Sequence, residues 1–219
     1  MGKLSIVSTP IGNLDDITLR AIKTLSSVDA VLCEDTRHTG QLLHLLNIKN
    51  SRLIRFDDHT EENTLPEIID LLQSDKHIAL VSDAGTPLIS DPGFRIVREC
   101  IKRGIAVESV PGPSALLAAL TCSGLPADKF LFFGYPPEKS SHRNKLFASL
   151  PKDTTIIFYC APHKLQQTLD DMKEVLGDIE ITIARELTKI HEEIWRGTLS
   201  DALTHFSKPQ GEFVILFRL

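Results

Sequence analysis

Three loops rich in glycine, proline and small polar residues are the places in this sequence where a ligand could bind. They read STPIGN at residues 8–13, SDAGTPLISDPG at 82–93 and VPGPSA at 110–115. Glycine lets the backbone approach a ligand closely, proline stiffens a loop, and small side chains leave room for a flat adenine or a ribose. A single loop of this kind is more often a plain turn. Three of them, each after an apolar segment that predicts a strand, favour a binding site at one edge of a sheet.

The known phosphate-binding signatures are absent from the sequence. There is no GxGxxG after the first apolar segment and no GxxxxGK[ST] anywhere. This argues against a nucleoside triphosphate enzyme and against the common methyltransferases that have a glycine-rich first loop. A ligand held without a phosphate cradle fits better, and a cofactor that carries adenosine and an amino acid is of this kind.

The segment CEDTRHT at residues 33–39 gathers ionisable groups in one corner between a strand and a helix. In one interpretation Asp35 or Thr36 caps the helix and Arg37 pairs with Glu34. In the other, these groups face a substrate, since five consecutive polar residues exceed what a cap requires. Both interpretations stay open at this point.

A second polar segment, DDHTEE at residues 57–62, could suggest a metal site. However, Thr60 is a natural helix N-cap, and Glu61 and Glu62 suit the first turn of a helix. We therefore expect a helix to start there, leave the role of His59 open, and expect no metal ion. The four cysteines are far apart, which predicts neither a disulfide framework nor a zinc site.

The segment ARELTKIHEE at residues 184–193 is a dense charged turn between two apolar segments. A hairpin tip needs solvation but not this many mixed charges, so we favour a functional role. The segment FYCAPHK at 158–164 lies at another corner between a strand and a helix, where Pro162 suits a helix start. By itself it is weak support for a site.

The formal net charge of −5 argues against a protein that binds nucleic acid over its whole surface, because phosphate binding relies on dense Lys and Arg. Two local basic patches are candidates for RNA contact, with a solvated charged surface as the alternative. The first contains Lys139, His142, Arg143 and Lys145, and the second contains Arg37, His38, Arg52 and Arg55.

The sequence predicts a cytoplasmic protein that does not enter a membrane. No apolar run approaches the roughly 18 residues that a membrane span needs, and the apolar start is too short for a signal peptide. The scattered cysteines suit a reducing compartment.

Apolar and amphipathic segments alternate through the first half, which predicts a parallel sheet with helices on both faces. Strands are expected at residues 4–8, 30–33, 53–56, 78–81 and 106–110, with helices at 17–25, 41–46, 65–72 and 94–102. In the second half, residues 181–187 and 192–199 can pair antiparallel, which predicts a mixed sheet. We therefore expect an α/β fold with two domains, residues 1–111 and 112–219.

A series of sequence blocks recurs in the order shown by one family. The blocks are TPIGNLDDITLRA, CEDTRHTGQLL, VSDAGTPLISDPG, VPGPSALLAAL followed by SGLP, FYCAPHKL, ARELTKIHEE, RGTL and GEFVILF. From residue 3 to residue 217 the chain resembles the small-subunit ribosomal RNA 2'-O-ribose methyltransferases I, a group within the tetrapyrrole methylases. The resemblance implies a class III fold of two α/β domains with S-adenosylmethionine in the cleft between them. It also implies 2'-O-methylation of a cytidine ribose in 16S ribosomal RNA, as naked RNA or in the small subunit, by a homodimer without a metal.

The resemblance also implies which residues form the site. The cofactor would contact Pro10, Ile11, Gly85, Thr86, Pro87, Ser90, Ser114, Ala115, Cys160 and Leu187, mostly through main-chain atoms. For such a reaction, the charged segments described above offer Asp35, Glu186 and His191 as candidates for the base that removes the hydroxyl proton, with no ranking among them. The candidates for RNA contact are Arg37, His38, His59, Lys139, Arg143 and Lys189.

Three departures from the family pattern bear on these expectations. Cys160 stands where the family usually has Glu, and Lys164 stands where it usually has Arg. Most relatives continue beyond the last strand with a small helical extension, whereas this chain ends at Leu219. These departures leave open a cofactor-binding module without catalysis. The fold itself leaves open a second alternative, a methylase of a porphyrinoid small molecule.

Overall fold

The computed structural model describes residues 2–49 and 52–219. The chain divides into two compact units, Met1–Ser114 and Ala115–Leu219, which we call the N-terminal and C-terminal domains. The boundary predicted from the sequence, between residues 111 and 112, precedes this division. Among the helices of the described residues, none has the length and apolar character to cross a membrane.

The N-terminal domain is built on a parallel five-stranded sheet with the order β3-β2-β4-β1-β5. The strands are β1 (Lys3–Val7), β2 (Ala30–Cys33), β3 (Arg52–Arg55), β4 (His77–Leu80) and β5 (Ala106–Val110). The helices are the 3-10 helix η1 (Leu14–Asp16) and the α-helices α1 (Leu19–Ser27), α2 (Thr36–Leu45), α3 (Glu61–Gln73) and α4 (Phe94–Lys102). All four residues of β2 are buried, as expected for a strand covered on both sides.

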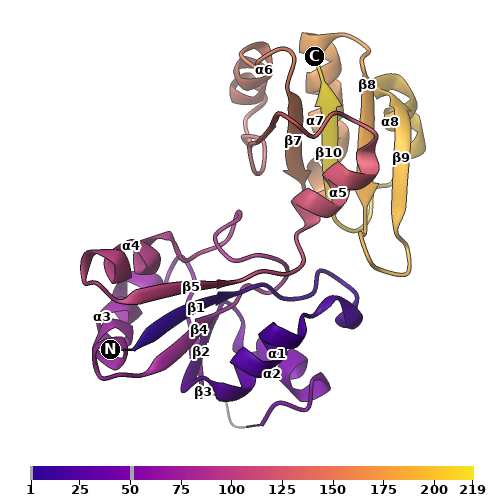
Figure 1. Ribbon diagram of the computed structural model, residues 1–219. Coiled ribbons are helices and arrows are strands. Elements are labelled where there is room, and N and C mark those ends of the chain that lie inside the picture. Colours follow the sequence, from indigo (N-terminus) through magenta and orange to yellow (C-terminus); the bar gives the residue numbers. More distant parts are fainter. Residues whose placement is uncertain (1, 50–51) are drawn as a thin grey trace. The chain divides into compact units, whose positions relative to one another are not determined.

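Helices cover both faces of this sheet (Figure 1). On one face, apolar residues of α3 and α4 such as Ile68 and Ile96 pack against the strands. On the other face, residues of α1 and α2 such as Leu25 and Leu43 do the same. The predicted parallel sheet with helices on both faces is therefore confirmed.

The C-terminal domain contains a mixed five-stranded sheet with the order β6-β7-β10-β8-β9. Its strands are β6 (Phe130–Phe132), β7 (Thr155–Cys160), β8 (Glu180–Arg185), β9 (Glu193–Thr198) and β10 (Phe213–Arg218), and its helices are α5 (Ala115–Ser123), α6 (Ser140–Ala148), α7 (Pro162–Leu176) and α8 (Leu199–His205). Strands β6 and β7 run parallel, while β7 with β10, β10 with β8, and β8 with β9 pair antiparallel. The predicted antiparallel hairpin is the pair β8 and β9, so the mixed sheet is confirmed.

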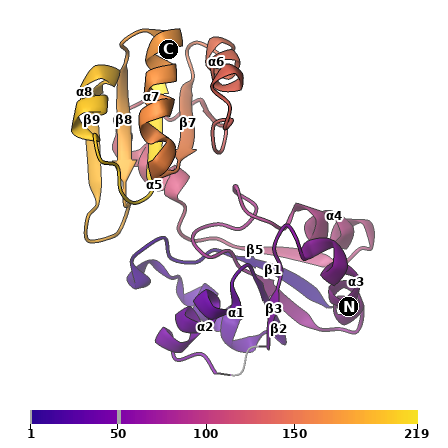
Figure 2. The ribbon, with the colours of Figure 1, turned by 180° about the vertical axis from the view of Figure 1, so that it is seen from behind.

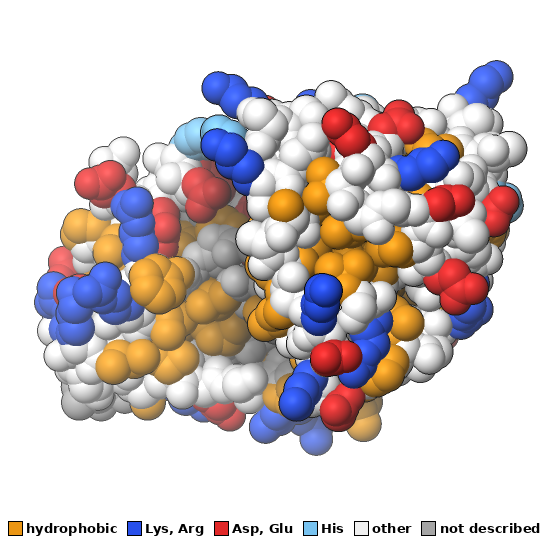
Figure 3. All heavy atoms as spheres, turned by 90° about the horizontal axis from the view of Figure 1, so that it is seen from above, with side chains coloured by type: hydrophobic (Ala, Val, Ile, Leu, Met, Phe, Trp, Pro, Cys, Tyr) orange, Lys and Arg blue, Asp and Glu red, His pale blue; other side chains and the backbone are white. Residues whose placement is uncertain are grey.

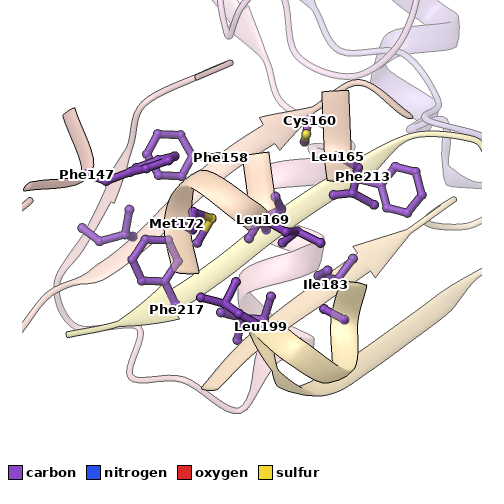
Figure 4. Packing of buried hydrophobic residues seen from close by; sticks show 14 of the residues in the cluster. Phe147, Phe158, Cys160, Leu165, Leu169, Met172, Ile183, Leu199, Phe213 and Phe217 are labelled. Atoms are coloured by element: carbon purple, nitrogen blue, oxygen red, sulfur yellow. The ribbon is translucent and has the colours of Figure 1, made fainter. Parts of the chain in front are cut away.

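The core of the C-terminal domain lies between one face of this sheet and the helices α6, α7 and α8 (Figures 2 and 4). Phe158, Met172, Leu199 and Phe217 are among its buried residues. Helix α5 packs against β8, β9 and β10. Figures 1 and 2 show α5 on the face of the sheet opposite to α7.

Arg143 is buried in this domain, which corrects its prediction as an RNA contact. Its side chain is only 1% exposed. Its Nε donates to the carboxylate of Asp171 at 2.6 Å, and one of its terminal nitrogens donates to the carbonyl oxygens of Pro137 at 2.9 Å and Glu138 at 2.6 Å. A buried charge is tolerated when it is paired and hydrogen-bonded in this way. Arg143 therefore anchors the segment before α6 and is not available to a nucleic acid.

Candidate functional site

The three glycine- and proline-rich loops meet at one edge of the N-terminal sheet. They follow β1, β4 and β5, and β1 lies between the other two strands. Because all three strands are parallel, their carboxyl ends reach the same edge. The prediction that these loops lie together is therefore correct.

Hydrogen bonds tie the three loops into one unit. The backbone of Thr9 and that of Gly85 exchange two hydrogen bonds, of 2.8 Å and 3.1 Å. The hydroxyl of Thr86 lies 3.1 Å from that of Ser8 and donates to the carbonyl oxygen of Pro113 at 2.9 Å. A single threonine therefore joins all three loops, so the loop cluster is held in shape before any ligand binds.

Several residues of the loop at 82–93 have left-handed backbone conformations. Gly85 has φ of +85°, and a Cβ at this position would lie 3.3 Å from a methyl carbon of Ile11. Leu88 and Ser90 also have positive φ, +72° and +65°, although both carry side chains. Such strain persists where the surrounding structure enforces it, and it concentrates at ligand-binding sites.

Most of the predicted cofactor contacts belong to this loop cluster. Within the N-terminal domain it brings together Pro10, Ile11, Gly85, Thr86, Pro87 and Ser90. Ser114 is the last residue of this domain and Ala115 is the first residue of α5.

The two predicted cofactor contacts of the C-terminal domain end β7 and follow β8. Cys160 is the last residue of β7, and its side chain is buried. Leu187 is buried in the turn after β8, between Glu186 with φ of +49° and Thr188 with φ of +65°. Strands β7 and β8 both flank β10.

Asp35 caps helix α2 and holds Arg37. Its carboxylate accepts a hydrogen bond from the backbone N–H of Arg37 at 2.8 Å and two from the Arg37 side chain, at 3.1 Å and 2.7 Å. The Arg37 guanidinium thereby keeps the pKa of Asp35 well below its usual range. A carboxylate with so low a proton affinity is a poor general base, which weakens its candidacy.

One interpretation of the sequence paired Glu34 with Arg37, but Arg37 pairs with Asp35 and Glu34 is in a different environment. The carboxylate is partly buried and lies near Asp91 and Asp83. Burial, followed by the charges of Asp91 and Asp83, raises the pKa of Glu34 to about 7. Burial likewise raises the pKa of Asp91 to about 6.

A cavity of about 650 Å³ opens at the carboxyl ends of β2, β3 and β4. Its lining consists of Glu34, Asp35, Thr36, Arg37, Arg55, Asp57, Asp58, His59, Asp83 and Pro92. Five of these ten residues are acidic, and both arginines pair with carboxylates of the same cavity, Arg37 with Asp35 and Arg55 with Asp57. In the part of the chain that the structure describes, no three His, Cys, Asp or Glu residues are arranged to hold a metal ion.

The start of α3 differs in detail from the expectation. Thr60 occupies the N-cap position but forms no capping hydrogen bond with its side chain. Instead, the carboxylate of Asp57 accepts from the backbone N–H groups of His59 and Thr60, both at 2.9 Å. Asp57 therefore organises the turn, because an aspartate can bond to the backbone two residues ahead. The side chain of His59 remains exposed at the cavity.

The charged turn after β8 is an ion-pair network. One oxygen of the Glu186 carboxylate accepts from Lys189 Nζ and from the backbone N–H of Glu212, both at 2.9 Å. Burial favours a higher pKa for Glu186, but these hydrogen bonds outweigh it and lower the pKa. Lys189 also pairs with the Glu212 carboxylate at 2.9 Å. Glu186 is therefore a structural anchor of the turn, while His191 is exposed.

Comparison with known proteins identifies the relatives of this chain. The profile of the tetrapyrrole (corrin/porphyrin) methylases matches residues 3–203. A protein of Thermotoga maritima named ribosomal RNA small subunit methyltransferase I is 49% identical over 99% of this chain and 98% of its own length. A protein of the same name from Synechocystis is 48% identical over 99% of this chain and 78% of its own length.

A solved structure shows the same fold. The uroporphyrin-III C-methyltransferase of Thermus thermophilus in complex with S-adenosylhomocysteine aligns with a TM-score of 0.66 at 18% identity. The alignment covers 98% of this chain and 97% of that enzyme. The tetrapyrrole-methylase-like fold expected from the sequence is therefore confirmed.

Proposed function

Because this chain belongs to the tetrapyrrole methylase family, we propose that it methylates the ribosomal RNA of the small subunit, in the cytoplasm, at the 2'-hydroxyl of a cytidine ribose. The observation that carries the proposal is the identity of 49% to a protein named for small-subunit ribosomal RNA, over nearly the whole of both chains. The methylases of this family take the methyl group from S-adenosylmethionine.

The loop cluster at residues 8–13, 82–93 and 110–115 is our proposed binding site for this cofactor in the N-terminal domain. At Gly85 the backbone has φ of +85°, and a Cβ there would be in tight contact with Ile11, so this position favours glycine. A cluster with no phosphate cradle suits a ligand that carries an adenosine and an amino acid. From the resemblance, we further propose main-chain contacts at Cys160 and Leu187.

In this reaction the bound cofactor supplies an electrophilic methyl group. The protein then has two tasks, which are to align the ribose hydroxyl for in-line attack and to remove its proton. The first task requires a rigid site, which the hydrogen bonds among Thr9, Gly85 and Thr86 provide. The second requires a base with high proton affinity beside the loop cluster.

We propose RNA contacts at the exposed basic and histidine side chains of the predicted set. Arg37, His38 and His59 lie on the cavity or next to it in the N-terminal domain, and Lys139 precedes α6 in the C-terminal domain. Lys189, the last of the set, is held by Glu186 and Glu212. The local positive charge is thus small, so we expect RNA shape to contribute to recognition.

We also propose that the protein acts as a homodimer. Strand β6 lies at the edge of the C-terminal sheet and carries the exposed side chains of Phe130 and Leu131, followed by the exposed Phe133 and Tyr135. Figure 3 shows hydrophobic side chains gathered on the surface among charged ones. An apolar edge strand is a liability unless it is covered. Sedimentation of the protein at micromolar concentration would test this, and a monomer would refute it.

The test of the proposed function is transfer of a labelled methyl group to three substrates. These are isolated small ribosomal subunits, naked 16S ribosomal RNA and a uroporphyrinoid. We expect labelling of the RNA, in one or both of its forms, and a 2'-O-methylated nucleoside after complete digestion. Labelling of the porphyrinoid alone would refute the RNA assignment, and cofactor binding without any transfer would indicate a module without catalysis.

A further inference from the structure

We propose that Glu34 is the general base that takes the proton of the attacking hydroxyl. This inference rests on the methyl transfer proposed above. The hydroxyl oxygen forms a bond to the methyl carbon, and the carbon–sulfur bond breaks with its electron pair going to sulfur. The hydroxyl proton passes to the Glu34 carboxylate and from there to water. Charge and atoms balance without a metal or a further reactant.

Glu34 lies next to the loop at 82–93, which is part of the loop cluster. It directly follows β2, which lies beside β4 in the sheet. Its carboxylate accepts a hydrogen bond from the backbone of Asp83, the second residue of the loop at 82–93. Two residues further along this loop is Gly85, where the loops after β1 and β4 are joined. Glu34 is thus fixed to the same loop that carries the proposed cofactor contacts.

Glu34 also faces a space that can admit a substrate. It lines the cavity of about 650 Å³, which is within the range of small-molecule sites and gives room for a nucleotide extruded from RNA. Both arginines of this cavity are occupied by other carboxylates. Among the described residues, Glu34 forms no ion pair, so its carboxylate is available to a hydroxyl.

The surroundings of Glu34 give it the proton affinity that a base needs. The charges that act most on Glu34 are carboxylates, Asp83 and Asp91 in the loop at 82–93 and Asp58 after β3. The two arginines of the cavity, Arg37 and Arg55, are paired with Asp35 and Asp57. With burial, the three carboxylates raise the pKa of Glu34 to about 7, close to the pH at which most enzymes work. The rival carboxylates Asp35 and Glu186 have lowered pKa values, because each is held by a cation.

The first test is substitution of Glu34 by glutamine, which keeps the shape and removes the base. We expect single-turnover methyl transfer to small subunits to fall by roughly 10²–10⁴-fold, with the affinity for S-adenosylmethionine unchanged. Glu34→Asp keeps a carboxylate and should retain more activity than Glu34→Gln. The matched control is Glu67→Gln on α3, since Glu67 is exposed and pairs with the exposed Arg52.

The second test is the pH dependence of the single-turnover rate. A base acts when it is deprotonated, so the wild-type rate should rise with a midpoint near pH 7, the pKa of Glu34, and level off about one pH unit higher. Asp91→Asn removes a neighbouring negative charge, which lowers the pKa of Glu34 and moves the rise to lower pH. A purely structural role of Glu34 would not produce this displacement.

The outcomes separate the two proposals. If the wild type methylates RNA but Glu34→Gln keeps its rate within about threefold, Glu34 is not the base, while the proposed function stands. If the Asp91→Asn variant has the same pH profile as the wild type, this outcome too shows that the base is a group other than Glu34. If the wild type transfers no methyl group to RNA, the proposed function fails and the role of Glu34 fails with it.

Discussion

Glu34→Gln should make the protein more stable at alkaline pH. In the folded protein the pKa of Glu34 is raised from its ordinary value of 4.5 to about 7, mainly by burial and then by the charges of Asp91 and Asp83. Between these two pH values the folded state binds more protons than the unfolded state, so stability falls as pH rises. The loss is absent below about pH 4.5 and complete above about pH 7. At 1.36 kcal/mol for each pKa unit the full shift corresponds to about 3 kcal/mol, and because the carboxylate is only partly buried, screening by solvent reduces the loss of stability to about 1–2 kcal/mol.

Glutamine cannot ionise, so the variant should not lose this stability. Thermal unfolding of the wild type and the variant, followed at pH 4.5 and pH 8.5, measures the difference. We expect similar midpoints at pH 4.5 and a midpoint for the variant that is about 2–8 °C higher at pH 8.5. Glu67→Gln, at an exposed position, should follow the wild type at both pH values. A variant that is equally or less stable than the wild type at pH 8.5 would refute the raised pKa of Glu34.

Three further substitutions test the loop cluster and the C-terminal core. Gly85→Ala should weaken cofactor binding in calorimetry by at least about tenfold, since φ is +85° and the added methyl group meets the side chain of Ile11. The control is Gly104→Ala, where φ is +68° but the space around the residue is open, and this variant should bind the cofactor normally. Thr86→Val removes the hydroxyl that joins the loops and should weaken the same binding by about tenfold, a loss of roughly 1–2 kcal/mol; unchanged affinity would show that the bridge is dispensable. Asp171→Asn leaves the buried guanidinium of Arg143 without its counter-ion, so the free energy of unfolding of the C-terminal domain, measured in urea, should fall by about 3–5 kcal/mol. Asp170 is exposed, so the control Asp170→Asn should change this free energy by about 0.5 kcal/mol or less.

The loop cluster could be predicted from the sequence because its causes are local. Glycine and proline define turns, and apolar segments of strand length define where the turns begin. The rule that parallel strands end at one edge then brings loops that are far apart in the chain together. No tertiary contact had to be known, and the bridge between Thr9 and Gly85 is the direct result.

The interior position of Arg143 could not be predicted in the same way. In the sequence it lies among Lys139, His142 and Lys145, where it reads as one member of a basic surface patch. Its burial depends on Asp171, which lies 28 residues later on α7 and meets it through the packing of α6 against α7. A run of basic residues in the sequence shows only that the charges are neighbours along the chain. Whether one of these side chains is buried depends on whether the fold places an acidic partner beside it, as it does with Asp171.

Glu34 and Asp35 show most clearly where sequence reasoning reaches its limit. The two residues are adjacent and carry the same functional group, and one interpretation of the sequence paired Arg37 with Glu34 and gave the helix cap to Asp35 or Thr36. The turn decides the pairing: Asp35 is the N-cap of α2, so its short side chain bonds to the backbone of Arg37 and, from that position, also to its guanidinium. Glu34 is then left in a partly buried environment among carboxylates. The cap thus lowers the proton affinity of Asp35 and leaves the carboxylate of Glu34 free to act as a base. If Arg37 paired with Glu34 instead, this difference in proton affinity between the two carboxylates would be lost.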